Sequence, residues 1–262
     1  MKRGLALVVA AVVAVSTPVL SRTDDRIGVV VMHGKGGSAA APTPVGRLAG
    51  ALRDAGFLVA APDMPWSKTR RLDRTLAGSM AEIDAAVERL RARGAGRIVV
   101  GGHSMGAAAA LGYGARQSGV AGILAIAPGH FIDLQGYQRR VGHDYRRARR
   151  LIESGAGDRA AEFRDINQGR ETIFEVSPRI YLSWYDPAGP ASMKRNAANL
   201  KPKTPLLWII GERDKLNVKR GRSYAFDRAP AHPRNAYVVV DGGHRVTPIK
   251  GESEIIAWLR EL

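Results

Sequence analysis

Six short runs of apolar residues recur along the chain, and in each one nearly every side chain is apolar. Continuous runs of this kind, without alternation, are typical of strands buried on both faces of a parallel sheet. The runs are RIGVVVMH (26–33), FLVAAPD (57–63), RIVVGG (97–102), GILAIAP (122–128), PLLWIIG (205–211) and AYVVVDG (236–242). Between several of them, apolar positions recur every three or four residues and predict amphipathic helices. The pattern therefore predicts an α/β fold with a mostly parallel six-stranded sheet flanked by helices.

The predicted helices carry recognisable end signals. Thr43 and Pro44 are a candidate N-cap and first helical residue, and Gly56 follows the end of the same segment. Ser79 and Glu82 have the spacing of a capping box, which predicts that the second helix begins there.

One interval breaks the alternation of strands and helices. About 75 residues separate the strand that ends near Pro128 from the strand that starts at Pro205. A structureless loop of that length is improbable in a compact domain. We therefore predict that residues 131–200 form a mostly helical lid, inserted before the penultimate strand. Its segment GYQRRVGHDYRRARRL (136–151) has six arginines and one acid, which fits a solvated helix face or a face toward anions or a membrane.

The first residues have the pattern of a targeting segment. Lys2 and Arg3 precede an apolar run of twelve residues, 4–15, which is followed by small residues and Pro18. Twelve residues are too few for a spanning helix and normal for the apolar part of a signal peptide. Residues 1–21 are predicted to be a signal peptide, with an uncleaved N-terminal anchor as the alternative. The main domain is then 26–262, and the protein is expected to be exported, periplasmic or secreted.

Composition adds two constraints. The chain has no cysteine, which excludes disulfides, a thiolate metal site and a cysteine nucleophile. Its 40 Lys and Arg outnumber 24 Asp and Glu, a net charge of +16 that attracts anionic substrates or surfaces. No nucleic-acid-binding motif accompanies this charge, so specific nucleic-acid binding is not expected. Arginine bias in a G+C-rich coding sequence is the alternative explanation.

Ser104 lies in the motif GHSMG (102–106), between a buried run and an alanine-rich stretch. A sharp strand-to-helix turn presents a serine hydroxyl above the sheet, and glycines two positions away on each side avoid collisions with neighbouring backbone. The context predicts a nucleophilic serine.

A serine nucleophile needs a base and a carboxylate that orients it. His244 follows the last predicted strand and is the candidate base; Asp214 in GERD follows the previous strand and is the candidate acid. Glu212 and Asp133 are alternatives for the acid. Of the other histidines, His103 is expected to pack inside the turn and His130 to line the pocket, whereas His143 and His232 are expected at the surface.

Glycines in MHGKGG (32–37), at the end of the first strand, allow the backbone to approach the reacting centre. The backbone N–H groups of Lys35 and Met105 are the candidate oxyanion-hole donors. The segment lacks both glycine patterns of nucleotide-binding loops, so nucleotide binding is not expected.

Taken in order, HGKGG, GHSMG, the Asp of GERD and the His of GGH resemble the α/β-hydrolase superfamily, including its dienelactone-hydrolase-like and esterase–lipase-like members. The resemblance covers residues 26–262, with the six strands corresponding to the family's third to eighth. It implies Ser104 as nucleophile, His244 as base, Asp214 as orienting acid, and Lys35 and Met105 as backbone donors, without metal or cofactor.

The implied reaction is hydrolysis of a carboxylic ester through an acyl-enzyme. Thioester hydrolysis or acyl transfer on the same triad, and a non-catalytic binding protein on this fold, are the alternatives. The substrate is expected to be a small-molecule or lipid-like ester. The positive charge adds two hypotheses, an anionic substrate and peripheral contact with anionic surfaces. The arginine-rich insert argues against a triglyceride lipase, and a serine nucleophile argues against dehalogenase and epoxide-hydrolase chemistry.

Overall fold

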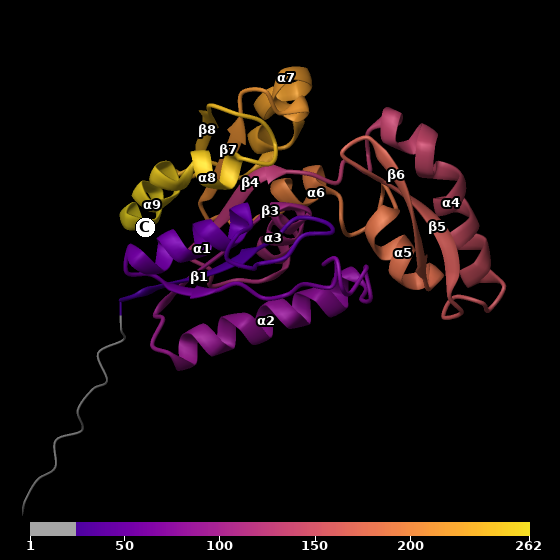
Figure 1. Cartoon of the computed structure of the whole chain (residues 1–262), viewed down its shortest axis with the longest axis horizontal. Coiled ribbons are helices and arrows are strands. Elements are labelled where there is room, and N and C mark those ends of the chain that lie inside the picture. The colour runs from indigo at the N-terminus through magenta and orange to yellow at the C-terminus, as the bar shows by residue number, and fades with distance from the viewer. Residues whose placement is uncertain (1–24) are drawn as a thin grey trace, which may run out of the picture.

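A computed structural model describes residues 25–262 of the chain. The predicted signal segment, residues 1–21, lies outside the described residues. Figure 1 shows a central sheet with helices on both sides and a lobe of helices and strands to one side of it.

The central sheet has six strands, all parallel to their neighbours. They occur at the six predicted apolar runs, in the spatial order β2-β1-β3-β4-β7-β8. Their bounds are β1 (Ile27–Met32), β2 (Leu58–Ala60), β3 (Arg97–Ser104), β4 (Gly122–Pro128), β7 (Leu206–Gly211) and β8 (Ala236–Val240). Because all six strands run in one direction, the loops that follow them meet at one edge of the sheet.

Helices cover both faces of this sheet (Figure 1). Successive residues of a strand point to opposite faces. On one face, Val30 belongs to a core cluster that includes residues of α2 (Leu76–Ala92), α3 (Met105–Arg116) and α6 (Met193–Ala198). On the other face, Val29 and Val31 belong to a cluster that includes residues of α1 (Pro44–Asp54) and α9 (Glu252–Glu261). The short helix α8 (Thr247–Lys250) precedes α9. Burial on both sides explains why the strands are apolar throughout.

The ends of α1 are as predicted, but α2 begins earlier than expected. The Thr43 side chain accepts a hydrogen bond from the Gly46 N–H at 3.0 Å. The α2 cap is Thr75, whose hydroxyl accepts from the Gly78 N–H at 3.1 Å, so the capping box at Ser79 was wrong. Thr75 offers the same capping oxygen one turn earlier, and the longer helix also buries Leu76.

The segment between β4 and β7 forms most of the lobe at the side of the sheet (Figure 1). It contains α4 (Gln135–Glu153), an antiparallel hairpin of β5 (Ala161–Asn167) and β6 (Arg170–Val176), then α5 (Pro178–Tyr185) and α6. The prediction of a mostly helical insert omitted this hairpin. Its turn uses positive φ at Gln168 and Gly169, and Phe163 stacks on Tyr181 with ring centroids 4.4 Å apart.

The connection from β7 to β8 carries three short helices, α7 (Lys215–Arg220), η1 (Gly221–Tyr224) and η2 (Phe226–Arg228). They follow the carboxyl end of β7, and Tyr224 of η1 donates a hydrogen bond to Asp133 at the start of the insert. Among residues 25–262, no helix combines the length and the apolar content that crossing a membrane requires.

Candidate active site

Ser104 is the last residue of β3, and α3 begins at the next residue. Its backbone has φ 57° and ψ −116°, which is strained for a residue with a side chain. The flanking glycines make the turn possible. A Cβ on Gly102 would lie 2.7 Å from the Gly106 carbonyl carbon, and one on Gly106 would lie 2.7 Å from the Met32 oxygen. Close backbone packing around the turn therefore raises the hydroxyl clear of the sheet.

His244 lies in the loop after β8 and reaches Ser104 from the side. Its Nε2 is 3.0 Å from the Ser104 Oγ, and its Nδ1 is 2.7 Å from Oδ2 of Asp214. Because a carboxylate only accepts, Nδ1–H donates to Asp214, which leaves Nε2 free to accept from the serine hydroxyl. The three residues predicted from the sequence are thus brought into one chain of hydrogen bonds.

Asp214 is held in place by the start of a helix. It caps α7, and its Oδ1 accepts from the Leu216 N–H at 2.8 Å, while its other oxygen faces His244. The side chain is 3% exposed. One oxygen is fixed by the backbone, so the other has little freedom to turn away from the imidazole.

His103 supports His244 from behind. Its Nε2–H donates to the His244 carbonyl at 2.9 Å, and the two rings are 4.9 Å apart. Burial, reinforced by the neighbouring His244, lowers the pKa of His103 to about 3, so the ring stays neutral. The residue packs inside the turn as expected, but its hydrogen bond to the loop of His244 was not anticipated.

The alternative acids are engaged elsewhere. Glu212 is exposed and pairs with Arg213. Asp133 accepts from the Tyr224 hydroxyl at 2.6 Å and lies 2.7 Å from Nζ of Lys194. Neither carboxylate contacts His244 among the described residues, which leaves Asp214 as its acid partner.

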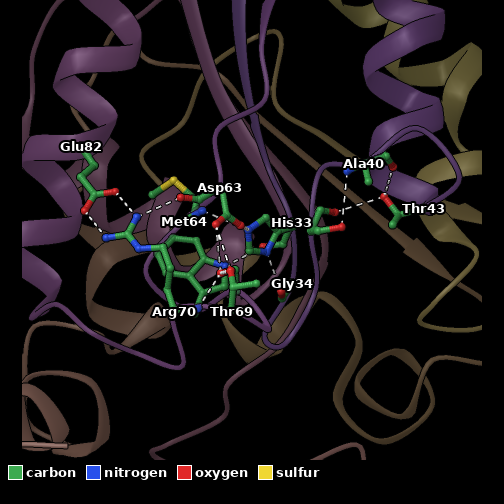
Figure 2. A network of polar contacts seen from close by, with 12 residues as sticks. His33, Gly34, Ala40, Thr43, Asp63, Met64, Thr69, Arg70 and Glu82 are labelled. Atoms are coloured by element: carbon green, nitrogen blue, oxygen red, sulfur yellow. Dashed lines mark hydrogen bonds and ion pairs between the residues drawn. The ribbon is translucent and has the colours of Figure 1, made fainter.

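The turn after β1 is fixed by His33 (Figure 2). The Met64 N–H donates to Nε2 of His33 at 3.1 Å, so Nδ1 carries the proton and donates to the Gly34 carbonyl at 2.8 Å. The indole N–H of Trp66 donates a hydrogen bond to the His33 carbonyl at 2.7 Å. Burial lowers the pKa of His33, which favours this neutral form. The turn that carries Lys35 is therefore held from its inner side.

The loop that contacts His33 is itself anchored by an arginine (Figure 2). Arg70 binds both carboxylate oxygens of Glu82, at 2.6 and 2.7 Å, and donates to the Asp63 carbonyl at 2.9 Å. Its partner Glu82 belongs to α2, so the pair ties this loop to the helix layer below the sheet. Asp63 has a structural role here, accepting from Ser67 and Thr69.

The Lys35 side chain reaches into the insert. Its Nζ lies 2.5 Å from Oδ1 of Asp165, which also accepts from the hydroxyls of Tyr185 at 2.6 Å and Tyr137 at 3.2 Å. Asp165 is fully buried and the Lys35 side chain is 7% exposed. Burial alone would raise the pKa of the Asp165 carboxyl, but the ammonium and the hydrogen bonds outweigh it and lower the pKa. This buried pair links the candidate oxyanion turn to the hairpin.

Ser104 and His244 lie in a cleft of about 1190 Å³ between the sheet edge, the insert and α7. The backbone donors predicted from the sequence, Lys35 and Met105, line the same cleft. Met105 is the first residue of α3, where N–H groups have no acceptor within the helix. The cleft thus contains a serine hydroxyl hydrogen-bonded to an imidazole, together with the two residues whose N–H groups are the candidate oxyanion donors.

Gly129 and His130 also belong to this cleft. A Cβ on Gly129 would lie 2.5 Å from the Ser104 Oγ, so only glycine leaves the hydroxyl free. His130 lines the cleft as expected, and its Nε2–H donates to the Trp184 carbonyl at 2.7 Å. The requirement at Gly129 was not visible in the sequence because it depends on the neighbouring strand.

A family model described as the alpha/beta hydrolase family matches residues 29–250. The chain belongs to this family. The match spans the sheet, both loops that carry His244 and Asp214, and the insert, and it confirms the fold that the four motifs implied. The family assignment therefore rests on a match across most of the chain and not on the serine motif alone.

Solved structures with the same fold include several lipid- and ester-cleaving enzymes. The alpha/beta hydrolase is similar to a monoacylglycerol lipase from Paleococcus ferrophilus, with 20% identity, TM-score 0.66 and coverage of 91% of this chain and 96% of that chain. A thermostable carboxyl esterase from Bacillus coagulans has 15% identity, TM-score 0.61 and coverage of 91% and 90%. Est1E from Butyrivibrio proteoclasticus, bound to ferulic acid, has 15% identity, TM-score 0.60 and coverage of 92% and 90%. No curated protein matches the chain significantly.

Proposed function

We propose that this alpha/beta hydrolase cleaves carboxylic esters through an acyl-enzyme intermediate on Ser104. The observation that carries the proposal is the hydrogen-bonded chain from Ser104 through His244 to Asp214. Structures with the same fold that are described as lipases and carboxyl esterases support the choice of esters.

In the first step, the Ser104 Oγ attacks the acyl carbonyl while Nε2 of His244 removes the hydroxyl proton. The proton on Nδ1 stays with the imidazole, and the Asp214 carboxylate stabilises the resulting imidazolium. The tetrahedral oxyanion accepts hydrogen bonds from the N–H groups of Lys35 and Met105, which need no rearrangement if the turn is already rigid. His244 then protonates the departing alcohol, and the C–O bond breaks.

In the second step, water replaces the alcohol. Nε2 of His244 takes a proton from the water as its oxygen attacks the acyl carbon, and the same backbone donors stabilise the second oxyanion. Collapse releases the acid and returns the proton to Ser104. The buried supports around His33 and Lys35 are consistent with this cycle, because a donor that moved would lose much of its effect.

The direct test is hydrolysis of para-nitrophenyl esters from acetate to palmitate. We expect Ser104→Ala to lower turnover by roughly three to six powers of ten, as removal of a triad nucleophile does. Ser223 lines the same cleft, so Ser223→Ala is a matched control that should keep turnover within a few-fold of the native enzyme. Comparable losses in both variants would contradict the assignment of Ser104.

We also propose that residues 1–21 direct export of the enzyme. The charged start at Lys2 and Arg3 and the apolar run of twelve residues support this. Cell fractionation and N-terminal sequencing of the recovered protein test it. A protein that stays in the cytoplasm with its first residues intact would contradict export.

A further inference from the structure

The walls of the cleft carry an unusual share of the molecule's positive charge. Among its 31 lining residues are ten Lys and Arg and only two Asp. The surplus of eight charges is half of the +16 of the whole 262-residue chain. A coding bias toward arginine would raise the charge everywhere, and does not by itself explain this concentration.

Both acids of the cleft are already occupied. Asp214 is bound to His244 and Asp133 to Lys194, so neither compensates the remaining cations. Three of the ten cations have ionic partners among the described residues: Lys35, Lys194 and Arg213. The other seven have none within residues 25–262.

These seven unpaired cations surround the mouth on two sides, and we call them the cationic rim. Arg139 and Arg140 come from the start of α4 in the insert. Lys215, Lys219 and Arg220 come from α7, on the opposite wall. Arg228 and Arg245 complete the rim. All seven residues are exposed, so their charged ends are free to meet a ligand.

The floor of the cleft differs from its rim. Phe131, Leu134 and Leu216, none of them exposed, line the cleft together with Ser104 and His244. A ligand that fits this distribution has an apolar part beside the nucleophile and a negative group toward the mouth. Guanidinium groups bind carboxylates and phosphates through paired hydrogen bonds, and the combined field of the rim raises the rate of encounter with anions.

We propose that the substrate of this enzyme is an anionic ester, with a carboxylate or phosphate group bound by the cationic rim and the scissile ester held at Ser104. The inference rests on the proposed ester hydrolysis and adds the chemical class of the substrate. The negative group can belong to the acyl part or to the alcohol part of the ester.

The test compares esters that differ only in charge. Para-nitrophenyl hydrogen suberate and para-nitrophenyl octanoate have acyl chains of equal length, one ending in a carboxylate and the other in a methyl group. We expect kcat/KM for the suberate to exceed that for the octanoate by about tenfold or more at low salt. Raising the ionic strength from about 0.01 M to about 1 M should remove most of this preference, because the Debye length falls from about 30 Å to about 3 Å and the charges are then screened from each other.

A second arm places the charge on the alcohol. Butyrate esters of para-hydroxybenzoate, of hydroquinone monophosphate and of methyl para-hydroxybenzoate separate a carboxylate, a phosphate and a neutral group. A preference for either charged ester over the neutral one supports the proposal and identifies which anion the rim binds.

Variants locate the effect. Arg139→Gln with Arg140→Gln, and separately Lys219→Gln with Arg220→Gln, should lower the ratio of suberate to octanoate kcat/KM several-fold. The matched control is Arg47→Gln with Arg53→Gln, two exposed arginines of α1 outside the cleft, which removes the same charge. It should leave the ratio unchanged.

Failure of this inference is distinguishable from failure of the proposed function. Equal hydrolysis of charged and neutral esters would overturn the anionic preference while leaving esterase activity intact. No hydrolysis of any ester would overturn the proposed function itself. If anionic vesicles accelerate octanoate hydrolysis while the suberate is not preferred, the rim serves a lipid surface and the proposal is wrong.

Discussion

The substitution Asp165→Asn tests how strongly the insert holds the turn that carries Lys35. It keeps the size of the side chain and can still accept hydrogen bonds from Tyr137 and Tyr185, but it removes the only charge that faces the Lys35 ammonium among the described residues. Since Asp165 is fully buried and Lys35 is 7% exposed, water cannot replace the lost partner.

The expected cost follows from this burial. Breaking a buried ion pair by removing one partner destabilises a protein by about 3–5 kcal/mol, compared with about 0–1 kcal/mol for an exposed pair. In a domain of this size, each kcal/mol lowers the melting temperature by about 2–4 °C. We therefore expect Asp165→Asn to melt roughly 6–20 °C below the native protein.

Thermal unfolding followed by circular dichroism measures this shift, and a double-mutant cycle isolates the pair. Lys35→Met combined with Asp165→Asn removes both charges, so no ammonium is left unpaired, and the double variant should recover much of the loss. Exposed Arg91 and Glu88 form a reference pair, and Glu88→Gln should shift the melting temperature little. If Asp165→Asn lowers the free energy of unfolding by less than about 1 kcal/mol, the argument that the buried Lys35–Asp165 pair stabilises the fold is refuted.

The same variant has an expected effect on catalysis. If the Lys35 N–H stabilises the oxyanion, loosening its turn lowers kcat. The upper limit of this decrease is the effect of losing one oxyanion donor completely, about 100- to 1000-fold. Steady-state kinetics well below the melting temperature separate this from unfolding. An unchanged kcat in the folded variant would show that the insert does not position the donor.

Two further predictions concern backbone packing and acid stability. Gly106→Ala should destabilise the fold by about 1–3 kcal/mol and lower esterase turnover, because its Cβ would lie 2.7 Å from the Met32 oxygen; thermal melts and initial rates measure both. Acid should also destabilise the fold: burial lowers the pKa values of His103 and His130 to about 3, with the Lys35 ammonium adding to the effect at His130, whereas unfolded histidine titrates near 6.5. Between these values the unfolded state binds more protons, so the free energy of unfolding falls with decreasing pH, by on the order of 1.4 kcal/mol per pH unit for each histidine.

Matched variants check both predictions. Gly50 lies within α1 with nothing near its Cβ position, so Gly50→Ala should leave stability equal or higher, and a similar loss there would contradict the packing argument. His130→Gln should weaken the pH dependence of the melting temperature between about pH 6 and about pH 4. An identical slope would show that His130 is not a source of the acid sensitivity.

Much of the fold was predictable because the strongest signals are local. The apolar runs identify all six strands, since a strand buried on both faces has apolar side chains at both alternating sets of positions. The proximity of Ser104, His244 and Asp214 was predictable because each lies at or just after the end of a strand of one parallel sheet, and parallel strands end at a common edge.

The features that were missed depend on distant residues. The α2 start at Thr75 depends on packing that the Ser79 motif does not reveal. The first strand of the hairpin in the insert shows partial alternation between exposed and buried residues, but the prediction of a mostly helical insert was argued from the length of the interval and did not resolve this strand. Asp165 is a buried acid in that hairpin, and nothing near it in the sequence identifies Lys35, 130 positions away, as its partner.

Trapping the acyl-enzyme tests the central claim most directly. Rapid acid quench of the enzyme with para-nitrophenyl octanoate, followed by peptide mass spectrometry, locates the acyl group. The account predicts an octanoyl adduct on Ser104 that is absent from Ser104→Ala. An adduct on another residue, or ester turnover by Ser104→Ala at a near-native rate, would contradict it.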